Sequence, residues 1–150
     1  MFFAALTRLL LDGLLGFVAT LGFTLLFNVP RRAVLLCAGI GMVATMLRAG
    51  LQNAGVDGHL ATFVGALFVG LAGAPVARWQ AIPMIVFSIT GIITMIPGVS
   101  GFQTLVHFSR GDIMAGLQSA VQAGFGVGAI AAGIGAARII TDPEWGIDRD

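Results

Sequence analysis

The stretch "SITGIITMIPGVSGFQTLVHF", residues 88–108, contains no charged residue, yet Pro97 and Gly98 interrupt it. A continuous helix over residues 82–108 would be about 40 Å long at 1.5 Å per residue, which exceeds the roughly 30 Å hydrocarbon core of a bilayer. Proline removes a backbone donor and disfavours helical geometry in the residue before it, and glycine relieves steric limits. We therefore predict that this segment is a membrane helix broken within residues 95–100.

The rest of the chain is equally apolar. Of its 150 residues, 57% are hydrophobic and 10% are charged, and the mean hydropathy is +0.98; soluble domains carry about 25% charged residues. Each long apolar run should be helical, since unpaired backbone groups cannot face lipid. The runs also lack the alternation of polar and apolar residues that is typical of barrel strands. A bundle of four helices stays open, because Arg48 cuts the second run short. We predict an all-α integral membrane protein, a single transmembrane domain with about five spans near residues 9–27, 33–50, 59–77, 82–108 and 113–139.

The arginines distinguish the two sides of the membrane. With five spans, Arg8, Arg48 and Arg110 fall on one side, and five others fall on the opposite side: Arg31, Arg32, Arg78, Arg138 and Arg149. Because cytoplasmic loops are enriched in positive residues, we predict a multi-pass protein of the cytoplasmic (inner) membrane with a cytoplasmic C-terminus. The short acidic tail, residues 141–150, is too short to fold alone.

Several function classes lack their sequence signals. The chain contains no GxxxxGK[ST], no HExxH and no GxSxG motif. Its two histidines, single cysteine and unclustered acidic residues do not favour a metal site. A net charge of +1 gives no sign of nucleic-acid binding. We expect no cofactor, no metal, no nucleic-acid partner and no enzymatic activity.

Small residues recur at four-residue spacing in two spans. Gly124 and Gly128 form a GxxxG pair, which Ala129 and Gly133 follow at the same spacing. The third span repeats the pattern with three residues: Ala66, Gly70 and Ala74. Such faces let helix backbones approach closely in membranes. We predict close helix contacts here, some of them with another subunit or a second copy of the chain.

Polar residues follow the interruption at helical spacing. If the helix restarts near Val99, four residues form one continuous stripe: Ser100, Gln103, Thr104 and His107. Gln118 and Gln122 make a second polar face in the last span. Polar stripes in apolar helices face cavities or other helices, and hydrogen bonds between helices contribute only about 0.6 kcal/mol per pair. Both uses stay open at this point.

Two titratable residues are candidates for proton coupling. Asp12 lies in the first span, where an acidic residue is a proton-relay candidate, although a charge favoured by the helix dipole explains it as well. His107 changes charge near neutral pH. His59 begins the third span, and we interpret it as a loop residue. Arg31 and Arg32 are expected to hold the cytoplasmic surface.

Two stretches carry a resemblance to a known family. "LLFNVPRRAVLLCAG" (residues 25–39) and "IPMIVFSITGIITMIPGVSGFQT" (residues 82–104) resemble the short membrane half of the threonine/serine exporter family. The likeness extends from about residue 10 to residue 137. The first motif corresponds to Asn28, Pro30, Arg31 and Arg32, and the second corresponds to Pro83, Gly91, Pro97 and Gly98.

The resemblance implies a membrane subunit of a secondary exporter for small amino acids, working with a larger homologous subunit. Since no nucleotide site is visible, the proton gradient is the expected energy source. The expected substrate-binding residues are Gly91, Pro97, Gly98, Ser100, Gln103 and Thr104. Export of small organic carboxylates or dicarboxylates remains an alternative, as does a non-transporting scaffold subunit of a membrane complex.

Overall fold

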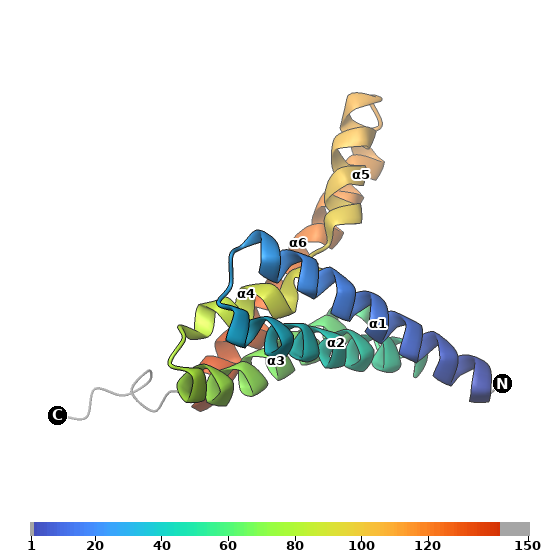
Figure 1. Cartoon of the computed structure of the whole chain (residues 1–150). Helices are drawn as coiled ribbons and strands as arrows, with labels where there is room; N and C mark the ends of the chain where they lie inside the picture. The colour runs from blue at the N-terminus through green and yellow to red at the C-terminus, as the bar shows by residue number, and fades with distance from the viewer. Residues whose placement is uncertain (1, 142–150) are drawn as a thin grey trace.

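The computed structural model describes residues 2–141, and the side chains of residues 6–141. In this range the fold is entirely helical, with six α-helices and one short 3₁₀ helix, which confirms the predicted all-α bundle (Figure 1). Four helices are long and apolar enough to cross a membrane, and a bent pair would make a fifth span. The elements are α1 (Phe2–Leu26), α2 (Arg31–Asn53), α3 (Gly58–Gln80), α4 (Met84–Ile92), η1 (Ile93–Met95), α5 (Gly98–Ser109) and α6 (Ile113–Thr141).

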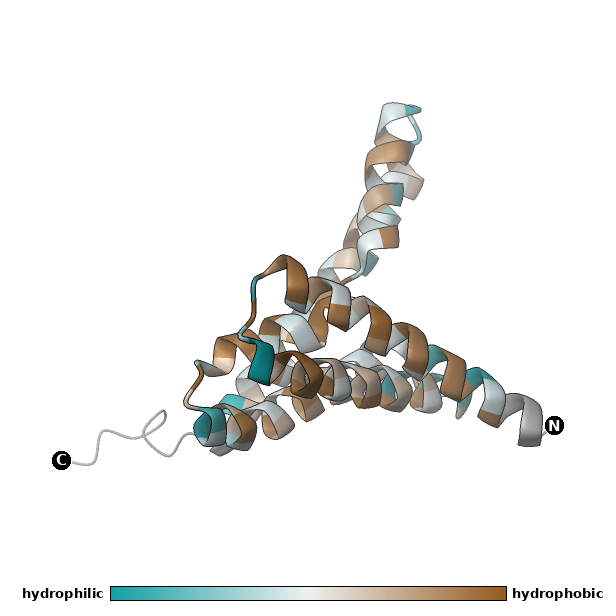
Figure 2. Cartoon of the chain, viewed as in Figure 1, coloured by the Kyte–Doolittle hydropathy of each residue, from teal (hydrophilic) through white to brown (hydrophobic). Residues whose placement is uncertain are grey.

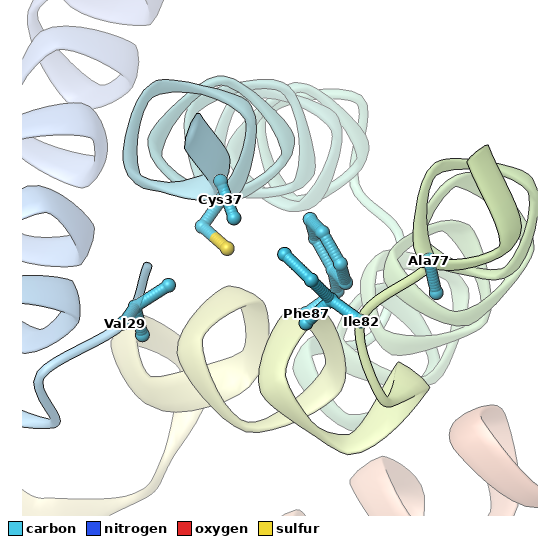
Figure 3. Packing of buried hydrophobic residues seen from close by; sticks show 6 residues of the cluster. Val29, Cys37, Ala77, Ile82 and Phe87 are labelled. Atoms are coloured by element: carbon cyan, nitrogen blue, oxygen red, sulfur yellow. The ribbon is translucent and has the colours of Figure 1, made fainter. Parts of the chain in front are cut away.

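Two similar turns join α1 to α2 and α3 to α4. In each turn a residue in the left-handed region, Asn28 (φ 53°) or Ala81 (φ 50°), precedes a buried aliphatic residue and then a proline. The prolines sit at the N-caps of α2 and α4, where their missing N–H costs no helical hydrogen bond. The aliphatic residues, Val29 and Ile82, share one core cluster with Cys37, Ala77 and Phe87 (Figure 3). Both turns therefore lie at the same end of the bundle.

Two arginines lie at the end of the bundle that carries both turns. Arg31 begins α2 beside the first turn, and Arg78, close to the second turn, donates a hydrogen bond to the carbonyl oxygen of Thr141 at the end of α6. At the other end, Leu9 of α1 lies beside Gly50 of α2, where an added Cβ would be 3.7 Å from Cδ1 of Leu9. The described chain thus begins and ends at opposite ends of the bundle. Figure 2 shows hydrophilic residues at the turns, on α1 toward its N-terminal end and on the projecting α5–α6 segment, while hydrophobic residues cover much of the helices.

The α3 and α6 helices run parallel and touch through small residues. Gly70 meets Ala137, and Gly133 lies against the backbone of Phe63 and Leu67. Ala66, Gly70 and Ala74 are buried, so the predicted packing face of the third span is confirmed.

The predicted small-residue face of the last span is confirmed in part: Gly133 packs closely on α3, whereas Gly124 and Gly128 make no close contact within the described chain. Gly124 and Gly128 face open space, with no atom within 4 Å of an added Cβ. The face of α6 that packs on α3 and on the break is offset from them, because Gly126, Ile130, Gly133 and Ala137 point toward these elements. The small-residue spacing therefore identified Gly133 on the packing side of α6, while contacts of Gly124 and Gly128 with another subunit stay a prediction.

The helix over residues 84–109 is broken, as predicted. η1 ends at Met95, Ile96 and Pro97 leave the helical path, and α5 leaves at an angle of 56° to the preceding segment. α5 packs on the first part of α6, and the two helices form a hairpin that projects from the body of the bundle (Figure 1). No residue of α5 is buried in the chain.

The contact between α6 and α3 provides a stability test. Gly133→Ala would place its Cβ 2.6 Å from the carbonyl oxygen of Phe63, so α6 must shift. We expect a loss of about 1–3 kcal/mol in stability, typical of overpacking, despite the better helix propensity of alanine. Thermal unfolding of the detergent-solubilised protein measures this loss.

Gly135→Ala is the matched control. It lies two residues away in the same helix, and nothing is within 4 Å of its added Cβ. It should leave the melting temperature unchanged or raise it slightly. Equal melting temperatures for the two variants would contradict the close α3–α6 contact.

Candidate substrate cavity

A polar cavity of about 400 Å³ lies where the broken helix meets the end of α2, the start of α3 and the middle of α6. Its lining combines hydroxyl, amide, imidazole and guanidinium groups with backbone from the break. A larger groove of about 590 Å³ runs between α4 and α6, but aliphatic side chains and few polar groups line it. We assign the site to the smaller cavity because its chemistry suits a polar ligand. It is lined by Arg48, Gly58, His59, Thr62, Thr94, Met95, Ile96, Pro97, Gly98, Val99, Ser100, Gln122 and Gly126.

Arg48 is the only charged residue in this lining. Its Nε donates a 3.0 Å hydrogen bond to Oγ1 of Thr62, and that hydroxyl donates in turn to the carbonyl oxygen of Gly58. No other hydrogen bond and no ion pair of Arg48 is present among the residues that the structure describes. The guanidinium is half-buried and carries a charge that no carboxylate of this part of the chain compensates. Such a charge within a membrane span is costly unless a ligand or a partner balances it.

The break brings a helix N-terminus to the same cavity. Pro97 occupies the N-cap of α5, and the N–H groups of Val99 and Ser100 have no backbone acceptor in the described chain. Unpaired amides and the positive end of the helix dipole favour anions. Gly126 allows α6 to cross here, since an added Cβ would stand 3.1 Å from Cγ of Pro97. Arg48 and the start of α5 together make the cavity electropositive.

Threonine hydroxyls connect the break to α2. Thr45 Oγ1 donates to the carbonyl oxygen of Gly41 and lies 3.1 Å from Oγ1 of Thr94. Because the single hydroxyl hydrogen of Thr45 is already used, the Thr94 hydroxyl is the donor in this pair. The pair orients Thr94 at the cavity wall, where its oxygen lone pairs remain available to a ligand.

His59 forms another part of the wall, at the start of α3. Its ring lies 5.8 Å from the ring of Phe125 on α6, measured between centroids. Asp57 caps this helix, because its Oδ1 accepts hydrogen bonds from the N–H groups of His59 and Leu60. The N–H groups of Leu60 and His59 lower the pKa of Asp57, so its carboxylate stays ionised at neutral pH.

The sequence-predicted site residues divide into two groups. Pro97, Gly98, Ser100 and Gln122 line the cavity. Gly91 lies elsewhere, against Val69, where an added Cβ would be 2.6 Å from Cγ1 of Val69.

The other predicted residues do not line the cavity. Gln103 and Gln118 are exposed on the projecting hairpin, and the Thr104 hydroxyl donates to the carbonyl oxygen of Ser100 in its own helix. His107 Nδ1 lies 4.0 Å from Oδ2 of Asp112 at the tip of the hairpin, and Asp12 is half-buried on α1. Their roles in binding or proton coupling stay predictions.

Sequence reasoning missed Arg48, His59, Thr62 and Thr94 as members of one site. A signal for the first three was present: Arg48 and Thr62 are seven residues on either side of Gly55, in the short connection between two helices. Residues equidistant from such a connection face each other in an antiparallel pair. His59 precedes Thr62 by about one helical turn and shares its face.

A bundle of membrane-length helices, with a polar cavity at a discontinuous helix, is an arrangement typical of membrane transporters. The family Threonine/Serine exporter, ThrE, matches residues 12–140, and the chain belongs to this family of amino-acid exporters. The matched region includes every residue that lines the cavity. No solved structure matches the chain.

Proposed function

We propose that this chain is a subunit of a secondary exporter for small amino acids of the threonine/serine type, and that the cavity binds the substrate. Alternating access driven by the proton gradient moves the substrate outward. The observation that carries the proposal is the uncompensated guanidinium of Arg48 in a polar cavity at a helix break. A carboxylate supplies the missing negative charge and accepts bidentate hydrogen bonds from guanidinium.

The remaining groups of the cavity suit the rest of such a substrate. The free amides of Val99 and Ser100 support a carboxylate, as at the discontinuous helices of other transporters. The oxygens of Thr94 and Gln122 accept hydrogen bonds from an ammonium or hydroxyl group. A cavity of about 400 Å³ is ample for an amino acid with a short side chain.

The composition of the cavity also bears on the alternative substrates. A dicarboxylate requires two positive partners, whereas Arg48 is the one permanently charged residue of the lining. We therefore favour an amino acid, which carries one carboxylate, over a dicarboxylate. The proposal includes no enzymatic activity, in keeping with a family of transporters.

Arg48→Gln tests the assignment of the cavity. Truncating one partner of a desolvated charge pair costs about 2–5 kcal/mol, so kcat/KM for threonine export should fall by at least roughly thirtyfold. The measurement is efflux of radiolabelled threonine from membrane vesicles at equal protein levels.

Arg110→Gln is the control for this change. It removes the same charge from an exposed position at the tip of the hairpin, outside the cavity, and should preserve export. Loss of export in Arg110→Gln, together with normal export in Arg48→Gln, would contradict the assignment of this cavity as the substrate site.

We further propose that a larger homologous membrane subunit completes the transporter. The assembled transporter then contains several copies of each chain. The exposed amides of Gln103 and Gln118 support this, because amides in an apolar setting require hydrogen-bond partners. The projecting hairpin has many exposed apolar side chains, including Phe102 and Leu105, and no other helix among residues 2–141 covers them.

The assembly is tested by reconstitution. Vesicles containing this chain alone should export threonine at background rates, and vesicles containing it together with the larger subunit should export actively. Equal rates for the two preparations would contradict the need for a partner.

The orientation is the last element of the proposal: an inner-membrane protein with the end of α6 in the cytoplasm. The grouping of Arg31, Arg32, Arg78 and Arg138 at that end of the bundle supports it. A reporter that is active only in the cytoplasm should be active when fused after Asp150 and inactive when inserted at Gly55. The opposite pattern would invert the topology.

A further inference from the structure

His59 is a titratable group in the cavity, and the function proposed above gives it no role. Its imidazole is half-buried and lines the cavity with Arg48. Neither ring nitrogen makes a hydrogen bond within the described chain, and the ring is held by its contact with Phe125. The side chain is therefore positioned by packing while its polar atoms remain available.

His59 lies on the same face of α3 as Thr62, the residue that accepts the hydrogen bond of Arg48. Arg48 is tied to Thr62, which follows His59 by three residues on α3. Side chains at this spacing are about 5–6 Å apart at Cβ. The α-ammonium of an amino acid is bonded to the same carbon as its carboxylate, so a carboxylate at Arg48 brings the ammonium within reach of this face.

The charges around His59 decide what it can bind. From α2 it faces the positive Arg48, and the connection before α3 supplies Asp57, whose Oδ1 accepts two backbone hydrogen bonds. From α6 it faces the uncharged Phe125 and Gln122, and the lining residues of η1 and α5 are also uncharged. A neutral imidazole has one nitrogen that accepts a hydrogen bond, and a protonated imidazole has none.

We propose that the neutral imidazole of His59 accepts a hydrogen bond from the substrate's ammonium group, so that the cavity holds either an amino acid or a proton on His59. This inference rests on the proposed function. Protonation removes the acceptor nitrogen and places a second positive charge beside the ammonium. A proton and the amino acid then compete for the cavity, which is the exchange required if inward proton flow drives outward transport. His59 releases its proton to the cytoplasm when the substrate binds there, and it takes up another proton from the outside when the substrate dissociates on that side.

The competition predicts a direction for the pH dependence. Histidine changes charge between pH 5 and 8, whereas threonine keeps the same net charge in this range. We expect threonine to bind about tenfold more weakly at pH 5.5 than at pH 8, since a protonated imidazole has no acceptor nitrogen for the ammonium group. The probe 3-hydroxybutyrate has the same hydroxyl and carboxylate but no ammonium, and its affinity should not fall on acidification.

The experiment measures binding of radiolabelled threonine to the purified full-length transporter at pH 5.5 and pH 8. His59→Gln retains a hydrogen-bond acceptor without a titratable group, so threonine should bind at both values with similar affinity, within several-fold of the wild type at pH 8. His59→Asn serves where the glutamine variant does not fold. An unchanged tenfold pH effect in these variants would overturn the proposal, as would an equal loss of 3-hydroxybutyrate affinity at pH 5.5 in the wild type.

Arg48→Gln separates this inference from the function on which it rests. Its loss of threonine binding at both pH values supports the cavity as the substrate site, whatever the result for His59. Retained binding in Arg48→Gln would refute the substrate site itself. A failure confined to the His59 variants would refute the proton competition alone.

Discussion

The backbone interruption at Ile96 and Pro97 is the constraint on which the rest of this architecture depends. Backbone that leaves the helical path inside a membrane must be covered by protein or must line a water-filled cavity. Both solutions occur here. α6 crosses at Gly126, where the missing side chain makes room for Pro97, and the opposite side of the break borders the polar cavity. The 56° bend that results also directs α5 away from the body of the bundle.

The energetic balance of the cavity follows from this arrangement. Opening the helix frees the amides of Val99 and Ser100, and Arg48 contributes a guanidinium with one hydrogen bond to Thr62. Each feature is unfavourable in an empty apolar environment, and both become favourable when an anion is bound. The proposed affinity for carboxylates therefore has its origin in the fold, at a cavity lined by four α-helices and η1. The hydroxyl pair of Thr45 and Thr94 fixes one wall of this site.

Local chemistry made part of this structure predictable from the sequence. Pro97 and Gly98 identify the break because proline and glycine act on their own backbone, and long uncharged runs identify the helices. The membership of the cavity depends on contacts between distant segments. In the sequence, Arg48 only interrupts an apolar run, and His59 is interpreted as a loop residue. The antiparallel pairing of α2 and α3 brings both side chains to the same cavity. Gln103 shows the converse, since helical spacing aligned it with Ser100 although it lies outside the lining of the cavity.

The central claim is that a solvent-accessible, anion-selective cavity surrounds Arg48, and thiol labelling tests it most directly. Cys37 is the only cysteine and is buried, so Ser100→Cys in a Cys37→Ala background places a single reactive thiol in the cavity lining. Its reaction rates are measured with an anionic and a cationic methanethiosulfonate reagent of similar size. We expect threonine to slow both reactions and Arg48→Gln to lower the anionic-to-cationic rate ratio several-fold. A ratio unaffected by Arg48→Gln, together with no protection by threonine, would contradict the claim.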